Sequence, residues 1–513
     1  MSGFSRRGAC PALSAPMQTG DGLLVRLNPL AGEIAPNTLI GLCESAARHG
    51  NGIVEVTARG SIQIRGLTAE SACLLAEEID ALGIAARTGV PVDTSPLAGI
   101  DPTEIADPSP LAAAIRTAIE RAGLAPRLGP KVSVVVDGRG QIGLGAIIGD
   151  VRMVAKDAER WRLSVAGDES SARLVGEFDT DAACAVTLDI LQAIAALGRQ
   201  GRARDLGPQV TRAVVEAYET SRSGTPPSVL PDISPTGSEI GSSGGSADHA
   251  ASPMGGGSDD SLISPLAAEM SGRTEWGAKD RELAVESPGN ADESTSEHST
   301  PTDSSLVGIL PLTDSRIALG IALPFGSLDA VTLIAFCQAA TAAGATGIRP
   351  APVRSLLVIG LDRASAATLT ATAKSLSLIT SPADPRIRIA ACPGAPACSS
   401  GMIAARDVAT DIATDLGESL DPELTLHVSG CAKGCAHPGP ATLTIVGDEK
   451  GAVFVVGGTA KGLPAAYTAG YEAARGMGRL TKLLAEERKP DENAAACLAR
   501  LGAKRLAQAL AQE

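Results

Sequence analysis

Residues 22–67 read GLLVRLNPLAGEIAPNTLIGLCESAARHGNGIVEVTARGSIQIRGL, and residues 318–361 read ALGIALPFGSLDAVTLIAFCQAATAAGATGIRPAPVRSLLVIGL. The two stretches can be laid on each other: their TLI triplets coincide, Cys43 meets Cys337, and both end in Gly-Leu. Self-similarity of this kind indicates an internal duplication. Coincidental Ala-rich helices of similar length are the alternative explanation.

Each copy is predicted to fold as a strand, a helix, a strand of alternating apolar residues and a second Ala-rich helix. The first helix should start near Pro36 in one copy and near Leu328 in the other. This order is typical of ferredoxin-like halves, two of which can close on each other around a pseudo-twofold axis. The predicted class is therefore α+β, with two duplicated ferredoxin-like half-domains that are each followed by an α/β domain.

Two strand pairs are predicted inside the α/β segments. In RLGPKVSVVVDGRGQIGLGAIIG, residues 127–149, two strands should join at the Asp137-Gly138 turn. In ATLTIVGDEKGAVFVVGGTA, residues 441–460, two strands should join across a Gly turn. The duplication is therefore expected to extend into these segments.

Composition separates the two copies. Residues 220–305 are rich in Ser, Gly and Pro and carry 14 acidic and 4 basic residues, a net charge of -10 out of -14 for the whole chain. Such a segment buries too little apolar surface to offset its ordering entropy, so it is expected to be a disordered linker. The predicted divisions are 1–85, 86–219, 220–305, 306–384, 385–488 and a C-terminal helix in 489–513.

The composition also limits the partners. Aromatic residues make up only 2% of the 513 residues, too few for base-stacking platforms, and the charge outside the linker is nearly balanced. Nucleic acid is therefore not an expected partner. No apolar segment follows the N-terminal arginines and no run of 18 apolar residues occurs, which favours a cytoplasmic protein that does not bind membranes.

Four cysteines form two short pairs, Cys392 and Cys398 in ACPGAPACSSG and Cys431 and Cys435 in SGCAKGCAHP. Four thiolates satisfy a [4Fe-4S] cluster, one for each iron. The C-x5-C and C-x3-C gaps are wider than the two-residue gap usual for structural zinc, so an iron-sulfur cluster is favoured. Zinc, two disulfides and ordinary buried thiols are the alternatives.

The cysteine spacing, the two halves and the TARGSIQIRGL strand together resemble the sulfite and nitrite reductases that couple a siroheme to a [4Fe-4S] cluster. The corresponding strand of that family reads TTRQxxQxRG. The resemblance implies that both α/β domains are of the sulfite reductase haemoprotein type. Within the superfamily, RRGACPALSAPMQTGDGLLVRL, PLAGIDP and CAKGCAHPGPA look most like the precorrin-3B synthases of aerobic cobalamin biosynthesis.

Site residues carry over only in part. Arg59 stands where the reductases place an arginine on the tetrapyrrole and its substrate anion, and Lys131 stands at the first lysine of their LPRKxK pattern. The second lysine is Ser133 here, and a further substrate arginine is either absent or represented by Arg87. This thinned anion pocket favours a relative that binds a tetrapyrrole as its substrate. A siroheme-dependent assimilatory sulfite or nitrite reductase is the alternative, and a non-enzymatic electron carrier is a third reading.

The resemblance implies insertion of one oxygen atom from O2 into precorrin-3A, with closure of a γ-lactone. A [4Fe-4S] cluster would deliver single electrons, and a mononuclear non-haem iron would stand where the reductases hold siroheme. The chain has no GxGxxG after a predicted strand, so a separate NADH-dependent electron donor is expected.

The substrate's carboxylates need cations at the rim of an apolar pocket. Arg59 and Arg65 are six residues apart, so on a regular strand both would face the same side. The remaining candidates are Arg26 for the rim, and His427, His437 and Cys10 as ligands of the second iron.

Overall fold

The computed structural model of the chain describes residues 11–30, 32–223 and 306–511. Cys10 and residues 224–305 of the predicted linker lie outside the described residues. Helix α5 (Pro208–Ser223) continues to the edge of this gap, so residues 220–223 are helical. No helix in the described ranges is both long enough and apolar enough to cross a membrane.

The first half is a five-stranded sheet with two helices on one face, in the strand order β1-β2-β4-β3-β12. Its helices start where the sequence provides a start signal: Pro36 occupies the first turn of α1, and Thr68 and Ser71 form a capping box on α2. The elements are β1 (Met17–Thr19), β2 (Gly22–Leu27), α1 (Pro36–His49), β3 (Ile53–Val56), β4 (Ile62–Leu67) and α2 (Ala69–Ala81).

The second half repeats this plan in a sheet of order β10-β11-β14-β13. Asp329 caps α6 by accepting a hydrogen bond from the Thr332 amide, and Asp362 caps α7 in the same way through the Ser365 amide. The elements are β10 (Gly308–Pro311), β11 (Ile317–Ala322), β12 (Ser327–Asp329), α6 (Ala330–Ala342), β13 (Gly347–Ala351), β14 (Ser355–Leu361) and α7 (Arg363–Ser375).

Each half has more strands than predicted: the structure adds β3 and β13, and also β1, β10 and β12. Strands β3 and β13 form antiparallel hairpins with β4 and β14. They are only four and five residues long, too short for the alternation of apolar residues to stand out beside the preceding helix. The α+β class with ferredoxin-like halves is confirmed.

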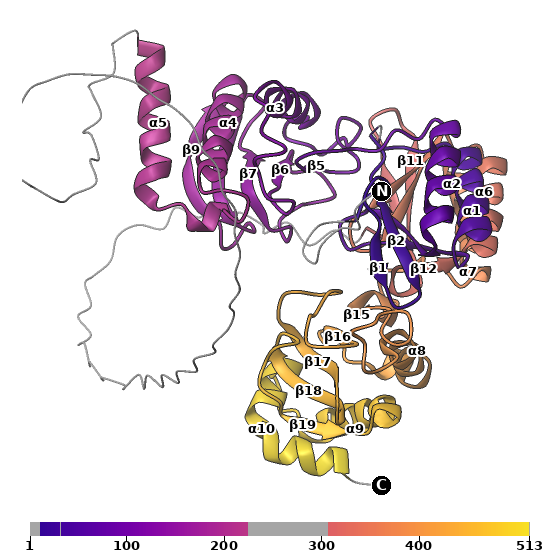
Figure 1. Cartoon of the computed structure of the whole chain (residues 1–513). Helices are drawn as coiled ribbons and strands as arrows, with labels where there is room; N and C mark the ends of the chain where they lie inside the picture. Colours follow the sequence, from indigo (N-terminus) through magenta and orange to yellow (C-terminus); the bar gives the residue numbers. More distant parts are fainter. Residues whose placement is uncertain (1–10, 31, 224–305, 512–513) are drawn as a thin grey trace, which may run out of the picture. The chain divides into compact units, whose positions relative to one another are not determined.

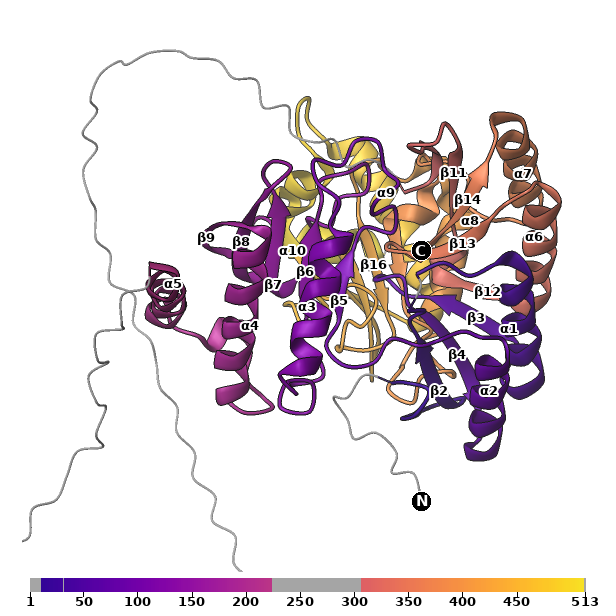
Figure 2. The same cartoon turned by 90° about the horizontal axis from the view of Figure 1, so that it is seen from above.

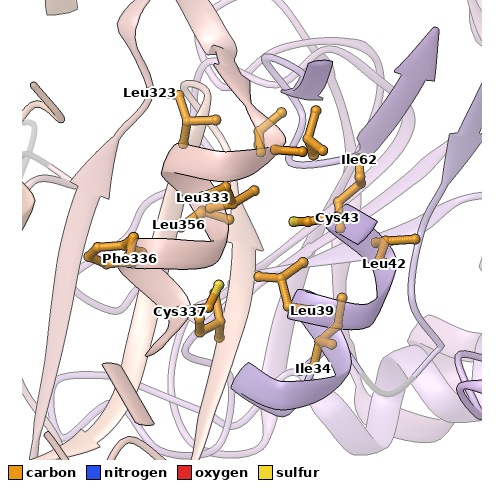
Figure 3. Packing of buried hydrophobic residues seen from close by; sticks show 14 of the residues in the cluster. Ile34, Leu39, Leu42, Cys43, Ile62, Leu323, Leu333, Phe336, Cys337 and Leu356 are labelled. Carbon is orange, nitrogen blue, oxygen red and sulfur yellow. The ribbon is translucent and has the colours of Figure 1, made fainter. Parts of the chain in front are cut away.

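The two halves share one core. Helices α1 and α6 pack side by side, and α2 and α7 flank them in a single layer (Figures 1 and 2). Aligned residues meet at the centre, where Cys43 and Cys337 are fully buried beside Leu39 and Leu333 (Figure 3). Burial raises the pKa of Cys337 to about 12, so this thiol packs as an apolar group. Each fully buried leucine here contributes roughly 1.5–3 kcal/mol.

The halves also exchange sheet edges. Strand β12 of the second half pairs antiparallel with β3 of the first. Reciprocally, Ile34 of the first half forms an isolated bridge with Ile348 of β13. The pseudo-twofold relation between the copies is therefore built into the backbone pairing as well as into the core.

Each half is followed by an α/β domain, and the two domains have the same sheet topology. The orders are β5-β6-β7-β8-β9 and β15-β16-β17-β18-β19, with the first three strands of each sheet parallel and the last two antiparallel. Val134 pairs with Val151 in one sheet and Leu426 pairs with Leu443 in the other, so both strands are displaced by 292 residues between copies.

The first α/β domain comprises β5 (Val92–Thr94), α3 (Ser109–Arg121), β6 (Val134–Asp137), β7 (Gly149–Ala155), β8 (Arg160–Gly167), β9 (Arg173–Asp179), α4 (Thr180–Ala196) and α5. The second comprises β15 (Ile389–Ala391), α8 (Ala405–Leu416), β16 (Leu426–Ser429), β17 (Ala441–Asp448), β18 (Gly451–Gly458), β19 (Ala466–Thr468), α9 (Ala473–Glu487) and α10 (Ala494–Ala511). Short 3-10 helices occur at Ala203–Asp205, Pro324–Gly326, Pro385–Arg388, Gly417–Ser419 and Gly470–Glu472.

One of the two predicted strand pairs is a hairpin and the other is not. Strands β17 and β18 join across a tight turn, as predicted. The prediction of a hairpin at Asp137-Gly138 is wrong, because β6 and β7 are parallel and a long loop, residues 138–148, connects them. The Asp137 carboxylate accepts hydrogen bonds from the amides of Arg139 and Leu144, which turns the chain into this loop instead of back along β6.

Candidate functional site

The four cysteines lie at the carboxyl ends of two neighbouring parallel strands. Cys392 directly follows β15, and Cys431 follows β16 after one glycine. Because parallel strands end at the same edge of a sheet, the two cysteine loops are brought together there. The C-x5-C loop closes through a hydrogen bond from the Cys398 amide to the Gly394 carbonyl at 2.8 Å.

Glycines allow the two loops to approach each other. A Cβ atom on Gly430 would stand 2.8 Å from the Gly394 Cα and 3.3 Å from the Gly401 Cα, so a side chain would push the loops apart. The Gly430 amide donates a hydrogen bond to the Cys392 Sγ at 3.1 Å, and the Met402 amide donates to the Gly430 carbonyl at 2.7 Å. The backbone thus forms a close-fitting support around the thiols.

The four thiols influence one another electrostatically. Burial raises the pKa of Cys435, and the neighbouring Cys392, Cys431 and Cys398 raise it further. Four thiolates so placed repel each other unless a metal compensates their charge. The donor set and its glycine support therefore fit a metal cluster.

A single metal ion makes a different demand. Among the described residues, no group of three or more His, Cys, Asp or Glu side chains closes around one point as a mononuclear site requires. In a cubane cluster, by contrast, each of four irons takes one thiolate, so the thiols need to surround a volume instead of a point.

Arg65 supports the cysteine loop from the first half. Its guanidinium donates to both carboxylate oxygens of Asp21 at 3.0 Å and to the carbonyl of Ala397, the residue before Cys398, at 2.6 Å. The side chain is 6% exposed. Arg65 therefore lies beneath the cysteine loop and positions it, and it does not stand at an open rim.

A buried polar network extends from Arg65 across the same face of the sheet. Glu55 lies 3.7 Å from Arg65 and accepts hydrogen bonds at 2.8 Å from Gln63 and from Arg406 of α8. Arg26 donates to Gln63 at 2.6 Å. The predicted rim residue Arg26 is thus part of this network, which attaches the first half to the cysteine-bearing domain.

Arg59 lies elsewhere, in the turn before β4. Alternation along β4 does not reach this turn, so the prediction that Arg59 and Arg65 share a face is wrong. Arg59 forms an isolated bridge with Pro352, and the Val353 amide donates to the Ala58 carbonyl at 3.0 Å. The hairpin tips of the two halves therefore pair with each other.

The paired tips contact both α/β domains. Arg59 donates to the Ile148 carbonyl at 2.7 Å, at the end of loop 138–148. Arg354, on the other tip, donates to the carbonyl of Ala436 at 2.6 Å, next to Cys435. Burial and, to a smaller extent, the charge of Arg406 lower the pKa of Arg354 to about 10. The tips thus connect the Arg59 side of the molecule with the cysteine loop.

Arginines gather around one carboxylate beside Arg59. Asp93 in β5 lies 3.7 Å from Arg59 and also interacts electrostatically with Arg87 and Arg116. Burial raises the pKa of Asp93, while the three arginines oppose this shift. We call Arg59, Arg87, Arg116 and Asp93 the arginine cluster; it carries more positive than negative charge.

Two exposed apolar residues adjoin the Arg59 turn. Ile148 and Val353, whose backbones contact this turn, are 51% and 46% exposed. Lys131 is exposed in the turn before β6 and has no hydrogen bond or ion pair to any described residue. The structure joins Arg59 and Arg87 in one cluster, whereas no contact places Lys131 in it.

His427 is fully buried in β16, and neither of its ring nitrogens has a hydrogen-bond partner among the described residues. Its ring stands 5.8 Å from that of His437, edge to face. Burial, together with the charges of His437 and Arg354, lowers the pKa of His427 to about 4. The two predicted histidines are therefore neighbours, but they do not form a complete ligand set.

The sequence offered little signal for Arg116, Arg354 and Asp93. They belong to three segments that only the tertiary fold brings near the site, and none of them stands in a spacing typical of a motif. Asp93 lies three residues before PLAGIDP, the segment that contributes to the family resemblance.

Residues 15–82 match the nitrite/sulfite reductase ferredoxin-like half domain. The structure of Mycobacterium tuberculosis NirA superposes with a TM-score of 0.64 over 94% of this chain and 84% of that chain, at 18% sequence identity, which shows a shared fold. A precorrin-3B synthase from Sinorhizobium sp is 34% identical over 510 residues, which is 99% of this chain and 95% of that protein. The chain therefore belongs to the precorrin-3B synthase family.

Proposed function

We propose that this protein is an oxygen-dependent monooxygenase that converts precorrin-3A to precorrin-3B in cobalamin biosynthesis. Family membership supports the reaction class. The observation that carries the proposal is the pairing of the two hairpin tips, which connects the arginine cluster, with the exposed Ile148 and Val353 at the Arg59 turn, to the cysteine loops. A large apolar ring with carboxylate side chains could place its carboxylates on the arginines and its ring on the apolar residues.

The proposed cofactor is a [4Fe-4S] cluster held by Cys392, Cys398, Cys431 and Cys435. When bound, it supplies electrons one at a time. The chain's own contribution is the support of the thiolates: the Gly430 amide donates to the Cys392 sulfur, and Arg65 fixes the Ala397 carbonyl beside Cys398. Amide and cationic donors of this kind stabilise sulfur that carries negative charge.

The proposed substrate contact within the arginine cluster is Arg59. An arginine presents five N–H donors in a planar fork that matches a carboxylate, and it keeps its charge at all relevant pH values. The exposed Ile148 and Val353 beside it offer apolar surface to the ring. Lys131 remains a proposed contact on the resemblance alone.

The proposal includes O2 as co-substrate and a separate NADH-dependent protein as the electron donor. It also includes a mononuclear non-haem iron, but the described residues do not by themselves fit one. His427 and His437 provide two nitrogens near each other and no third ligand.

The test is anaerobic purification followed by a single-turnover assay. We expect iron and acid-labile sulfide, a broad cluster absorbance without siroheme bands, and a product that gains one atom from isotopically labelled O2 when precorrin-3A and reductant are supplied. An Arg59→Ala variant should keep its [4Fe-4S] cluster and should have a higher KM for precorrin-3A. Siroheme bands together with reduction of sulfite or nitrite would instead support the reductase function.

A further inference from the structure

The arginine cluster contains its own anion. Asp93 stands 3.7 Å from the Arg59 guanidinium, and its side chain is 29% exposed against 47% for Arg59. The carboxylate therefore lies on the inner side of the cluster, and part of Arg59 faces outwards. A free anion that approached from solvent would meet an arginine that already has a partner.

The other two arginines lie on the inner side as well. Arg116 of α3 donates to the carbonyl of Val92, the residue before Asp93, at 2.7 Å. The Nε of Arg87 is buried without a hydrogen-bond partner, and burial lowers the pKa of Arg87 while Asp93 opposes that shift. A buried, incompletely bonded guanidinium next to a second one is a strong attractant for an anion.

We propose that Asp93 is a specificity-determining residue: it occupies the arginine cluster as an internal anion and so excludes small inorganic anions such as sulfite. Only the outward part of Arg59 then remains available, and a carboxylate on a large substrate can reach it. The inference rests on the proposed function, because it concerns the same arginines, but it predicts a different measurement.

The physical reason is competition for the same donors. A small anion gains most when several guanidinium groups surround it without water, and Asp93 removes that opportunity by providing a covalently tethered carboxylate at high local concentration. A substrate carboxylate attached to a large apolar ring does not depend on this inner position, because the ring contributes binding through the exposed Ile148 and Val353.

The experiment measures sulfite binding to the full-length, anaerobically purified protein by calorimetry. We expect Asp93→Ala to bind sulfite at least tenfold more tightly than the unmodified protein. Asp93→Asn, which keeps the side-chain volume, should show the same direction of change and serves if the alanine variant does not fold. The matched control is Asp189→Asn, since burial alone raises the pKa of Asp189 and no arginine contributes to that shift.

A double variant locates the gained anion. If sulfite binds the arginine cluster, adding Arg59→Ala to Asp93→Ala should abolish the gain. Unchanged sulfite affinity in both Asp93 variants, or a gain that survives loss of Arg59, would overturn the inference. The proposed function would fail separately, if the unmodified protein neither bound nor oxidised precorrin-3A.

Discussion

The two α/β domains have the same fold but different chemistry at corresponding positions. The constant displacement of 292 residues places Arg139 at the position of Cys431 and Gly143 at that of Cys435. Counted from the ends of β5 and β15, Ser95 corresponds to Cys392 and Asp101 to Cys398. In the first domain, Asp101 accepts hydrogen bonds from the Gln141 amide at 2.6 Å and from its side chain at 2.9 Å, which closes the space between the loops. The residues at four loop positions therefore determine whether this edge of the sheet carries thiols or is closed by hydrogen bonds between the loops.

The corresponding loops are also supported from different directions. In the first domain Arg152, buried in β7, donates to the Leu144 carbonyl at 2.8 Å from within the same sheet. In the second, the corresponding carbonyl belongs to Ala436 and receives its hydrogen bond from Arg354 of the second half. The cysteine loop is therefore complete only when a different domain is in place.

The interfaces with the two halves differ in polarity. The cysteine-bearing domain meets the polar face that carries Gln63 and Arg65. The aligned positions in the other half are Leu357 and Ile359, which pack in an apolar cluster with Leu97 and Ile142 of the first α/β domain. At these aligned positions, one interface places a charged side chain next to the thiols, whereas the other has apolar contacts.

The sharpest test of the comparison is replacement at one corresponding pair of loop positions. Cys431→Ser should remove or degrade the cluster, because a four-thiolate set loses one ligand. Arg139→Ala, at the equivalent position of the first domain, should leave the cluster content unchanged. Iron and acid-labile sulfide analysis measures both. Full cluster content in Cys431→Ser would contradict the ligand assignment.

The next effect concerns the two interfaces. Arg65→Met removes the buried cation from Asp21 and leaves Glu55 with Arg406 alone. It should destabilise the protein by roughly 3–5 kcal/mol. Ile359→Val, at the aligned position, should cost only about 0.5–1.5 kcal/mol. Urea midpoints from circular dichroism give the order. Only the Arg65 variant should also lose its cluster faster in air, and equal loss in both variants would show that the polar network has no special role.

A smaller effect should follow removal of either loop support. Arg354→Met should speed amide hydrogen exchange in residues 430–440, and Arg152→Met should speed it in residues 138–148. In each case the free energy of local opening should fall by about 1–3 kcal/mol. Hydrogen-exchange mass spectrometry on both variants measures this, and each variant serves as the control for the other. If each variant raised exchange equally in both loops, the conclusion that each loop has its own supporting arginine would be contradicted.

The smallest effect is on acid stability. Burial alone would raise the pKa of Asp21, but hydrogen bonds from Arg65 and Thr19 outweigh it and hold this pKa below 3.8. A depressed pKa stabilises the folded state above the unfolded value and loses that contribution as the pH falls through the folded value. The polar interface should therefore weaken below about pH 4, by no more than about 1 kcal/mol because Asp21 is partly exposed. Asp21→Asn should remove this pH dependence, as followed by urea unfolding between pH 3 and 6.

Much of the fold could be predicted because the repeat is visible in the residues. The helix start at Pro36 and the β17–β18 hairpin are local signals, and the structure has both. The parallel pairing of β6 and β7 was missed, because Asp-Gly favours a tight turn by itself but here begins a loop. Local chemistry could not show which strand would be the partner.

The candidate site was predictable only where its residues are close in sequence. The cysteine pairs stood out by their spacing, and the structure places both pairs at one sheet edge. By contrast, Arg65 and Ala397 are 332 residues apart, and Arg354 and Ala436 are 82 residues apart. Contacts over such distances depend on how the domains pack, and one sequence carries no periodic signal for that.

The strand β12 that completes the sheet of the first half has a consequence for the chain as a whole. Alone, the first half would present β3 with an open row of amides and carbonyls, which recruits any extended polypeptide. Because the second half contributes β12, neither copy is a self-sufficient module. The duplicated chain is an obligate pair within one polypeptide, and its halves need each other to avoid self-association as much as to assemble a site.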